Sequence, residues 1–397
     1  MAWNWQQPDW PNFSWDAARL RQAEEHFLVG AGVLAGTLRY LRHPDQEQLR
    51  VNALSTEAVT TSEIEGEMLD PASVQSSIRR QLGLATDQRR IRPAEEGIAE
   101  VMVELYRSYA EPLSDEALFS WHRMLFERRR GLRDIGRYRA GGDPMEIVSG
   151  PIQEPRVHFE APPSAKIPEE MARFLDWFNQ TRPSGASPLP ALTRAGIAHL
   201  YFESIHPFEE GNGRIGRAIS EKALTQGFHQ PPLSALAATI LLRRKAYYAA
   251  LEAANKSNEV TAWLSWFAGI AIEAQRRVTA QVEFLLEKTR LLDRLRGQLN
   301  PRQEKTVLRM LREGPEGFKG GLSAGNYAAI TGASPATTTR DLADLVEKGA
   351  LLREGQKRHA RYRLAIPVQS ASQVVIDEHG NFDHGASTPP SSTSSPR

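Results

Sequence analysis

The chain has 397 residues, of which 41% are hydrophobic and 24% are charged, and these values are typical of a soluble globular protein with two or three domains. Its 49 Lys and Arg nearly balance its 48 Asp and Glu, so net charge alone indicates no polyanionic partner. Cysteine is absent, which excludes disulfides, thiolate metal sites and cysteine nucleophiles.

Neither a targeting segment nor a membrane helix is predicted. The first residues lack the basic and apolar stretches of a signal peptide. The longest mostly apolar run, residues 233–242, is too short for a membrane helix, which needs about 20 residues. We therefore expect a cytoplasmic protein with no membrane partner.

The N-terminal region, residues 1–90, is predicted to be mostly helical. Four of the eight tryptophans lie within the first fifteen residues, mixed with two prolines. This segment is too irregular for a long helix and too aromatic to stay unfolded, so we expect it to pack against the rest of the protein. Residues 16–66 contain few helix breakers and are predicted to be helical.

The next region, residues 91–298, is predicted to combine helices with one β-hairpin. Helical spacing of apolar residues runs through 93–130, and helices are again expected over 168–299. Between them, residues 146–148 and 156–159 flank a Ser-Gly-Pro turn, which is typical of a strand, a turn and a second strand. We expect this hairpin within residues 145–160.

The most informative stretch is His206-Pro207-Phe208-Glu209-Glu210-Gly211-Asn212-Gly213-Arg214-Ile215-Gly216-Arg217. The residues before it are predicted to be helical, and Pro207 should end that helix. A glycine-rich turn follows, and a second helix is expected to start near Asn212. The loop would therefore present backbone N–H groups at a helix N-terminus, which favours bound anions.

The side chains of this stretch fit phosphate chemistry. Arg214 and Arg217 share one face of the first helical turn, where the helix dipole disfavours cations unless a polyanion is bound. Glu210 offers the single carboxylate that often holds Mg²⁺ together with phosphates and water. His206 can accept a proton from an attacking hydroxyl near neutral pH. Each feature alone has an ordinary structural explanation, but their combination within twelve residues favours phosphate transfer.

Residues 299–366 are predicted to form a separate small domain. A helix led by residues 337–342 is followed by strand-like pieces at 351–353 and 361–364, an order typical of a winged helix-turn-helix. Residues 367–397 end in Ser, Thr and Pro and are predicted to be disordered.

The small domain has two interpretations. Residues 301–366 carry 12 Lys and Arg against 7 Asp and Glu, and the expected wing contains Lys357, Arg358, Arg361 and Arg363. This excess favours contact with the phosphates of DNA. A protein-docking module with a solvated basic turn is the alternative.

The stretch 206–217 resembles the Fic signature, His-x-Phe-x-Asp/Glu-Gly-Asn-Gly-Arg-x-x-Arg, at every fixed position. Gly136-Arg137-Tyr138-Arg139, Tyr247-Tyr248-x-x-Leu251-Glu252-x-x-Asn255 and the expected hairpin also resemble family segments. The resemblance implies a mainly α-helical protein. A helical Fic core with a β-hairpin flap would be followed by the winged helix-turn-helix domain.

The resemblance also implies a role for each motif residue. His206 would be the general base and Glu210 the Mg²⁺ ligand. The nucleotide would be held by Gly211, Asn212 and Gly213 at the α-phosphate, by Arg214 and Arg217 at the β- and γ-phosphates, and by Tyr247, Tyr248 and Asn255 near the adenine and ribose.

The implied reaction moves AMP from ATP onto a Ser, Thr or Tyr hydroxyl of a target protein and releases pyrophosphate. The target's extended main chain would pair with the hairpin flap. Gly213 favours AMP transfer, because members with Lys at this position can be kinases. Transfer of UMP, phosphocholine or phosphate is an alternative on the same scaffold. A DNA-binding regulator with a sensing Fic core is an alternative from a different class.

Thr61-Ser62-Glu63-Ile64-Glu65-Gly66 resembles the inhibitory pattern Ser/Thr-x-x-x-Glu-Gly/Asn of self-inhibited Fic proteins. The resemblance implies that Glu65 pairs with Arg217, competes with the γ-phosphate of ATP and leaves ATP in an unproductive pose. The same carboxylate positions water in members that also remove AMP, so the reverse activity is a further expectation.

Overall fold

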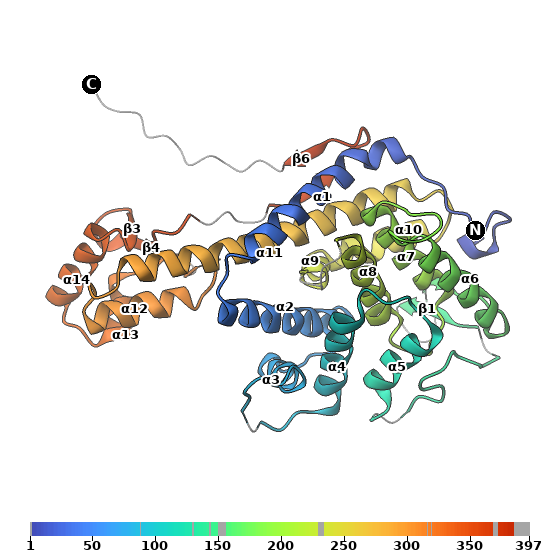
Figure 1. The fold of residues 1–397 in the computed structure, drawn as a ribbon, viewed down its shortest axis with the longest axis horizontal. Helices are drawn as coiled ribbons and strands as arrows, with labels where there is room; N and C mark the ends of the chain where they lie inside the picture. The colour runs from blue at the N-terminus through green and yellow to red at the C-terminus, as the bar shows by residue number, and fades with distance from the viewer. Residues whose placement is uncertain are drawn as a thin grey trace. The chain divides into compact units, whose positions relative to one another are not determined.

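The computed structural model (Figure 1) describes residues 2–87, 89–128, 131–142, 144–149, 156–228, 234–315, 317–318, 320–367 and 372–384. Within these ranges the chain is mainly α-helical, and its short strands form three two-stranded antiparallel sheets. The predicted mainly α fold class is confirmed. No helix in these ranges is both long enough and apolar enough to cross a membrane.

The helices are α1 (Ala17–Leu38), α2 (His43–Ile64), α3 (Pro71–Gln81), α4 (Pro93–Ser108), α5 (Asp115–Phe126), α6 (Ile167–Gln180), α7 (Ala191–Ile205), α8 (Asn212–Phe228), α9 (Leu236–Leu242), α10 (Arg244–Ala254), α11 (Thr261–Arg294), α12 (Pro301–Leu311), α13 (Ala324–Thr331) and α14 (Pro335–Glu347). The strand pairs are β1 (Glu146–Ser149) with β2 (Arg156–Glu160), β3 (Leu351–Glu354) with β4 (Arg361–Leu364) and β5 (Val374–Ile376) with β6 (Phe382–His384).

Helix ends follow from capping residues and backbone conformation. The Asp70 side chain accepts the N–H of Ala72 and precedes Pro71, which starts α3; this is a favourable helix N-terminus. α7 ends at His206, whose φ of 51° lies in the left-handed region, and the following Pro207 cannot continue the helix. The helix end that the sequence predicts at Pro207 is therefore present in the backbone.

The chain divides into two compact units. The first comprises the described residues of Met1–Ala35, Glu47–Gln275 and Ser372–Arg397, and the second those of Gly36–Gln46 and Arg276–Ala371. These limits differ from the boundaries expected at 90 and 298. The N-terminal region is not separate, because Leu20, Phe27 and Ile64 are buried in the same core as α7 and α8.

The core of the first unit is centred on α7 and α8, which pack along each other. Every residue of α7 from Leu192 to Ile205 is buried. A helix that is buried on all sides can hold a polar side chain only if that group has a partner or a function. His199 and Glu203 are such side chains, and both are directed to the site described below.

The Trp-rich N-terminal segment packs against the first unit, as predicted. Asn4 is fully buried, and its backbone N–H donates to the carbonyl of Asn255 (2.8 Å). The indole of Trp5 donates to the Glu160 carbonyl (2.6 Å) and that of Trp10 to the Glu170 carboxylate (2.9 Å). These bonds satisfy the polar edges of rings that otherwise bury apolar area.

Part of the expected disordered tail is ordered. Strands β5 and β6 form a hairpin in which Val374 and Ile376 are 6% and 7% exposed and belong to the core of the first unit. The Asp377 carboxylate accepts the N–H groups of His379 and Asn381 (both 2.8 Å) and closes the turn. The prediction of disorder is wrong for this segment, because short alternating apolar residues outweigh the Ser- and Pro-rich composition that follows.

In the second unit, α12, α13 and α14 precede β3 and β4. The sequence predicts one helix led by residues 337–342 and then two strands, and α14, β3 and β4 follow that order. The end of α11, α12, α13, α14 and β3 share a core that includes Leu291, Val307, Tyr327, Leu345 and Leu351. A bridge between Leu322 and Tyr362 joins β4 to the segment before α13. Because α11 contributes to this core, the unit begins earlier than expected. Its assignment as a winged helix stays a prediction.

Candidate active site

A cavity of about 850 Å³ opens in the first unit where α7 meets α8. Ten of the eleven predicted site residues line it: Glu65, His206, Glu210, Gly211, Asn212, Gly213, Arg214, Tyr247, Tyr248 and Asn255. The eleventh, Arg217, is bonded to Glu65 at its edge (2.7 Å). The structure thus brings together residues from α8, α10 and the end of α2, while their individual roles stay predictions.

The loop between α7 and α8 is held in shape by its own side chains. Gly211 has a φ of +87°, and a Cβ there would lie 2.6 Å from the ring of Phe126, so only glycine fits. The Asn212 amide accepts the N–H of Phe208 (3.0 Å) and donates to its carbonyl (2.8 Å). Because this side chain is occupied within the loop, Asn212 would reach a phosphate through its backbone N–H.

Arg139 braces the loop from outside. It is buried, and its guanidinium donates to the carbonyl of His206 (2.8 Å), the hydroxyl of Ser164 (2.9 Å) and the carbonyl of Pro162 (2.5 Å). The Arg139 N–H also donates to the Pro207 carbonyl (2.9 Å). Such a fork ties the start of the motif loop to the segment 162–164, which explains why the Gly136–Arg139 segment accompanies the motif.

His206 has the ionisation state that a general base needs. Burial, supported by the positive charge of Arg139, lowers the pKa of its imidazole to about 4, so the ring is neutral near neutral pH. Its Nδ1 faces Glu203, one turn earlier on α7, with 3.7 Å between Nδ1 and the Oε2 of Glu203. Burial, reinforced by the charge of Glu65, raises the pKa of Glu203 to about 8.

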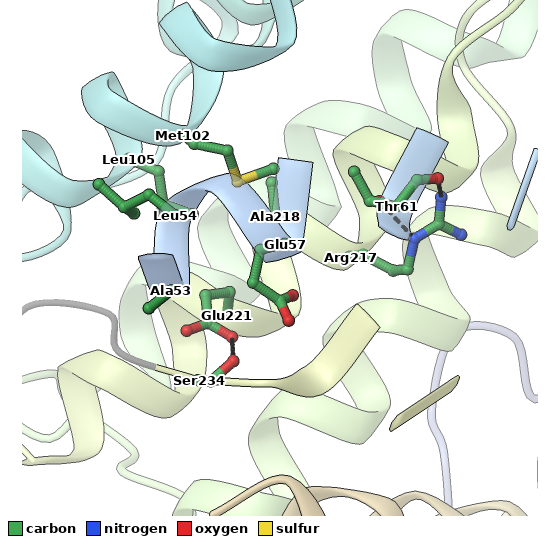
Figure 2. A pocket seen from close by; sticks show the side chains of 10 residues that line it. All are labelled: Ala53, Leu54, Glu57, Thr61, Met102, Leu105, Arg217, Ala218, Glu221 and Ser234. Atoms are coloured by element: carbon green, nitrogen blue, oxygen red, sulfur yellow. Dashed lines mark hydrogen bonds between the residues drawn. The ribbon is translucent and has the colours of Figure 1, made fainter. Parts of the chain in front are cut away.

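The Arg217 guanidinium is held by Thr61 of α2 and by Glu65, which directly follows α2. Its side chain is only 3% exposed and contacts Glu65 Oε1 through Nη2 (2.7 Å). It also donates from Nε to the Thr61 hydroxyl (2.7 Å) and from Nη2 to the Thr61 carbonyl (2.9 Å), as Figure 2 shows. Although burial alone would raise the pKa of Glu65, the charge and hydrogen bond of Arg217 hold it below its usual value. Glu65 is therefore ionised at neutral pH.

Gly213 makes room for this ion pair. A Cβ at position 213 would lie 2.2 Å from Oε1 of Glu65 and 3.1 Å from Nη1 of Arg217. Glycine at this position therefore leaves the space in which the Glu65 carboxylate lies beside Arg217.

Arg214 is likewise bound to carboxylates. Its side chain is 3% exposed and contacts Glu67 (2.7 Å) and Glu210 (3.1 Å). Glu210 itself is 55% exposed and lines the cavity. An exposed carboxylate in this position suits the predicted role of Mg²⁺ ligand, because Mg²⁺ keeps waters and phosphate oxygens in its shell. The described residues contain no cluster of three or more metal-binding side chains, so such an ion would depend on the nucleotide.

The predicted nucleotide-binding residues of α10 differ in accessibility. Tyr247 is buried, and its hydroxyl is hydrogen-bonded to Nε2 of His199 (2.7 Å). Asn255 is also buried and accepts a hydrogen bond from Ser204 (3.3 Å). Tyr248 is 41% exposed, and its hydroxyl donates to the carbonyl of Ile64 (3.2 Å) at the end of α2. Of the three, Tyr248 has the ring most open to a base.

The predicted hairpin borders the cavity. Ile147, Val148 and Val157 are 39%, 49% and 39% exposed, and a register irregularity separates the first two. Glu252 of α10 ties β2 down through Arg156 (2.8 Å) and His158 (2.9 Å). The predicted turn extends beyond Ser149 into residues 150–155, which lie outside the described ranges.

Four residues that contribute to the site were not predicted to do so. Arg139 was noted only as part of a family segment, and Thr61 only as part of the inhibitory pattern. Glu67 and Glu203 gave no chemical signal of their own. Glu203 had the clearest available signal, because an acidic residue three positions before a motif histidine, within an otherwise apolar helix, needs a partner when buried.

Comparison with known proteins shows which family the residues around the cavity resemble. Residues 112–224 match the model of the Fic/DOC family, and residues 3–84 match a domain of unknown function, DUF4172. Protein adenylyltransferase fic-1 of Caenorhabditis briggsae is 32% identical over 117 residues, which are 28% of this chain and 21% of that protein. A Fido domain-containing protein of Dictyostelium discoideum is 41% identical over 71 residues, 17% of this chain and 48% of that protein.

The matched segments thus span from about a fifth to about half of these two relatives. The crystal structure of a Fic family protein from Desulfovibrio desulfuricans covers 91% of this chain and 99% of its own, with 23% identity and a TM-score of 0.49.

Proposed function

We propose that this chain, which contains a Fic/DOC domain over residues 112–224, transfers AMP from ATP to a hydroxyl side chain of a protein. The observation that carries the proposal is the shared cavity. It combines the N-terminus of α8, Arg214 with Arg217 at its edge, the exposed carboxylate of Glu210 and a neutral histidine. These groups fit a triphosphate, a metal ion and a hydroxyl that must lose its proton.

The proposed reaction is a displacement at the α-phosphorus. The neutral imidazole of His206 accepts the proton of a target Ser, Thr or Tyr hydroxyl, and the oxygen forms a bond to the α-phosphorus. The bond from that phosphorus to the bridging oxygen breaks, and pyrophosphate leaves. When bound through Glu210, Mg²⁺ would neutralise charge on the phosphates. The backbone N–H groups of Gly211, Asn212 and Gly213 would hold the α-phosphate.

The target is proposed to bind along the β1–β2 hairpin. Strand β1 is paired on one side by β2, and the exposed apolar residues Ile147 and Val148 lie beside the cavity. An extended segment of another protein that adds to such a strand gains main-chain hydrogen bonds largely independent of its sequence. This geometry would bring a side-chain hydroxyl to His206.

The resting protein is proposed to be self-inhibited. Both arginines that would hold the β- and γ-phosphates are bound to carboxylates, Arg217 to Glu65 and Arg214 to Glu67 and Glu210. ATP must displace Glu65 to use Arg217 in full. The reverse reaction, in which Glu65 orients water toward a bound AMP group, uses the same carboxylate and is tested by the same variants.

Other transferred groups are the alternatives on this scaffold. Mass spectrometry of the modified protein separates them, since AMP, UMP, phosphocholine and phosphate add different masses. The expected product after incubation with ATP carries AMP.

Glu203 is proposed to position His206. Its carboxyl group faces Nδ1 at 3.7 Å, which is longer than a hydrogen bond. A small approach of the two groups would give Nδ1–H an acceptor and would fix the tautomer that leaves Nε2 free to take a proton. In a Glu65→Gly background, Glu203→Ala should slow AMP transfer by about tenfold without changing the KM for ATP. Glu203→Gln keeps an acceptor oxygen and should retain most of the rate.

The readout specific to positioning is the imidazole tautomer, measured by ¹⁵N chemical shifts of His206. Glu203→Ala should mix the two tautomers, whereas a merely structural role would leave them unchanged. An unaltered rate and tautomer in folded Glu203→Ala would remove Glu203 from the mechanism.

The second unit is proposed to bind duplex DNA. On α14, Thr339, Arg340 and Ala343 are exposed and share one helix face, a surface that fits a groove and its phosphates. The affinity of the full chain should fall at least about tenfold between 50 mM and 200 mM salt. Arg340→Ala should weaken binding, whereas Arg312→Ala, which removes the same charge at the C-cap of α12, should not. Absent or salt-independent binding would favour the protein-docking alternative.

A further inference from the structure

A second pair of glutamates lies between α2 and α8, outside the cavity that holds the motif. Glu57, Thr61 and Glu65 recur every four residues, so they share one face of α2. On α8, Arg217 and Glu221 are also four residues apart. Figure 2 shows Thr61 beside Arg217 and Glu57 beside Glu221, around a small cavity of about 20 Å³. The contact between α2 and α8 therefore extends one helical turn beyond Thr61 and Arg217, where the two carboxyl groups of Glu57 and Glu221 meet.

The surroundings of this pair provide little compensation for two negative charges. Glu221 is 6% exposed, its Oε2 accepts the Ser234 hydroxyl, and its Oε1 has no hydrogen-bond partner among the described residues. Glu57 accepts the N–H groups of Ala237 (2.9 Å) and Ala238 (3.5 Å) at the start of α9.

The rest of the cavity wall is mostly apolar. α4 contributes Met102 and Leu105, and α2 itself contributes Ala53 and Leu54. The charged group from α8 that faces the pair is Arg217, whose hydrogen bonds go to Thr61 and whose ion pair is with Glu65.

Two carboxylates in such a place cannot both be ionised without a cost in free energy. Burial, and then repulsion from Glu221, raises the pKa of Glu57 to about 8, and burial raises the pKa of Glu221 to about 7. Because both values lie above those of the unfolded chain, the docked arrangement is favoured below them and loses stability as the pH rises through them.

We propose that Glu57 and Glu221 form a proton-dependent latch, which holds α2 against α8 while the pair keeps a proton and frees Glu65 from Arg217 when both carboxyl groups ionise. Glu57 lies two turns before Glu65 on one helix, about 12 Å along its axis. A displacement of this helix at Glu57 therefore also moves the inhibitory carboxylate. The inference rests on the proposed self-inhibited AMP transfer.

The test compares wild type with Glu65→Gly at each pH. Glu65 has a lowered pKa and His206 one of about 4, so neither titrates near neutrality. Glu203 does, and the charge of Glu65 contributes to its raised pKa, so the contribution of Glu203 to the ratio is measured in the latch variants below, which keep both residues. The ratio of wild-type to Glu65→Gly labelling should rise about tenfold between about pH 6 and pH 9. This ratio reports release of the latch.

Glu57→Gln and Glu221→Gln remove the charge and keep the shape. Each latch variant is compared with a double variant that also carries Glu65→Gly. The labelling of the latch variant divided by that of its double variant should stay low and should not change across this pH range. The matched control is Glu63→Gln, also on α2 but outside both cavities, which should behave as wild type. A ratio that does not change with pH in wild type, or that still rises in both latch variants, would overturn the proposal.

Hydrogen exchange separates this inference from the proposed function. Protection of the α2 amides, compared between wild type and Glu57→Gln at the same pH, should be equal at about pH 6 and lower in wild type at about pH 9. If Glu65→Gly transfers no AMP to protein at any pH, the AMP-transfer proposal fails. The exchange comparison still shows whether the Glu57–Glu221 pair controls the docking of α2. Equal protection of α2 in the two folded proteins at both pH values would contradict the latch. If Glu57→Gln does not fold, Glu221→Gln replaces it in this comparison.

Discussion

Glu65→Gly should transfer AMP to protein at least about tenfold faster than the wild-type chain, because it frees a guanidinium that a phosphate can then use. In the resting structure Arg217 is 3% exposed and bound to Glu65 at 2.7 Å. Removing that carboxylate leaves Arg217 held by Thr61 alone, with its charge directed to the cavity. A charge-assisted bond to phosphate is worth about 1.5–3 kcal/mol, which corresponds to roughly tenfold or more in rate.

The same variant should be less stable without nucleotide. Truncating one member of a fully buried ion pair costs about 3–5 kcal/mol. The cost here should be lower, because the Glu65 side chain is 31% exposed and Arg217 keeps its bonds to Thr61. ATP with Mg²⁺ should raise the melting temperature of Glu65→Gly more than that of wild type, since a ligand of the native state adds stability by mass action.

Glu63→Gly is the matched control for Glu65→Gly, since it introduces the same flexibility into the same turn of α2 but lines neither cavity. It should label as weakly as wild type. Equal labelling by wild type and Glu65→Gly, with both folded, would contradict inhibition by this residue.

Removal of His206 should have the opposite effect. In the Glu65→Gly background, replacing the imidazole should slow AMP transfer by about 10²–10⁴-fold, the usual loss when a general base is missing. Nucleotide affinity should change little, because the phosphate cradle is built from α8 and the loop rather than from the imidazole. The measurement is the rate of labelling together with ATP affinity from calorimetry.

The choice of substitution matters at this position. His206 has a φ of 51°, a conformation that Asn adopts more readily than Ala. His206→Asn therefore keeps the backbone and removes the base, and it should lose as much activity as His206→Ala with a smaller loss of stability. A labelling rate near that of Glu65→Gly in either variant would mean that another group accepts the proton.

The local structure of the motif could be predicted from sequence because its residues are consecutive. Residues 206–217 determine a loop, a helix N-terminus and its arginines through turn and dipole rules that act over a few residues. The pairing of Glu65 with Arg217 joins distant segments and was expected only from family resemblance. The structure contains that ion pair; whether it inhibits is for the variants to decide.

Other features depend on tertiary packing and had no local signal. The Glu57–Glu221 pair arises only when α2 lies on α8, and each glutamate alone resembles a solvated residue. The limits of the units were missed because α1 and α2 bury apolar residues in the common core, while the end of α11 joins the other unit. The β5–β6 hairpin was missed because its strands are only three residues long, and the prediction followed the Ser-, Thr- and Pro-rich composition of the whole C-terminal segment.

One measurement tests the central claim most directly. Folded Glu65→Gly is incubated with Mg²⁺ and ATP labelled at either the α- or the γ-phosphate, in the presence of a cell extract as a source of target proteins, and protein-bound label is compared. AMP transfer predicts that the α label stays on protein, that the γ label leaves with pyrophosphate, and that His206→Asn abolishes the signal. Retention of γ label above the level seen with His206→Asn in the same extract, or no α label above that level, would contradict the account.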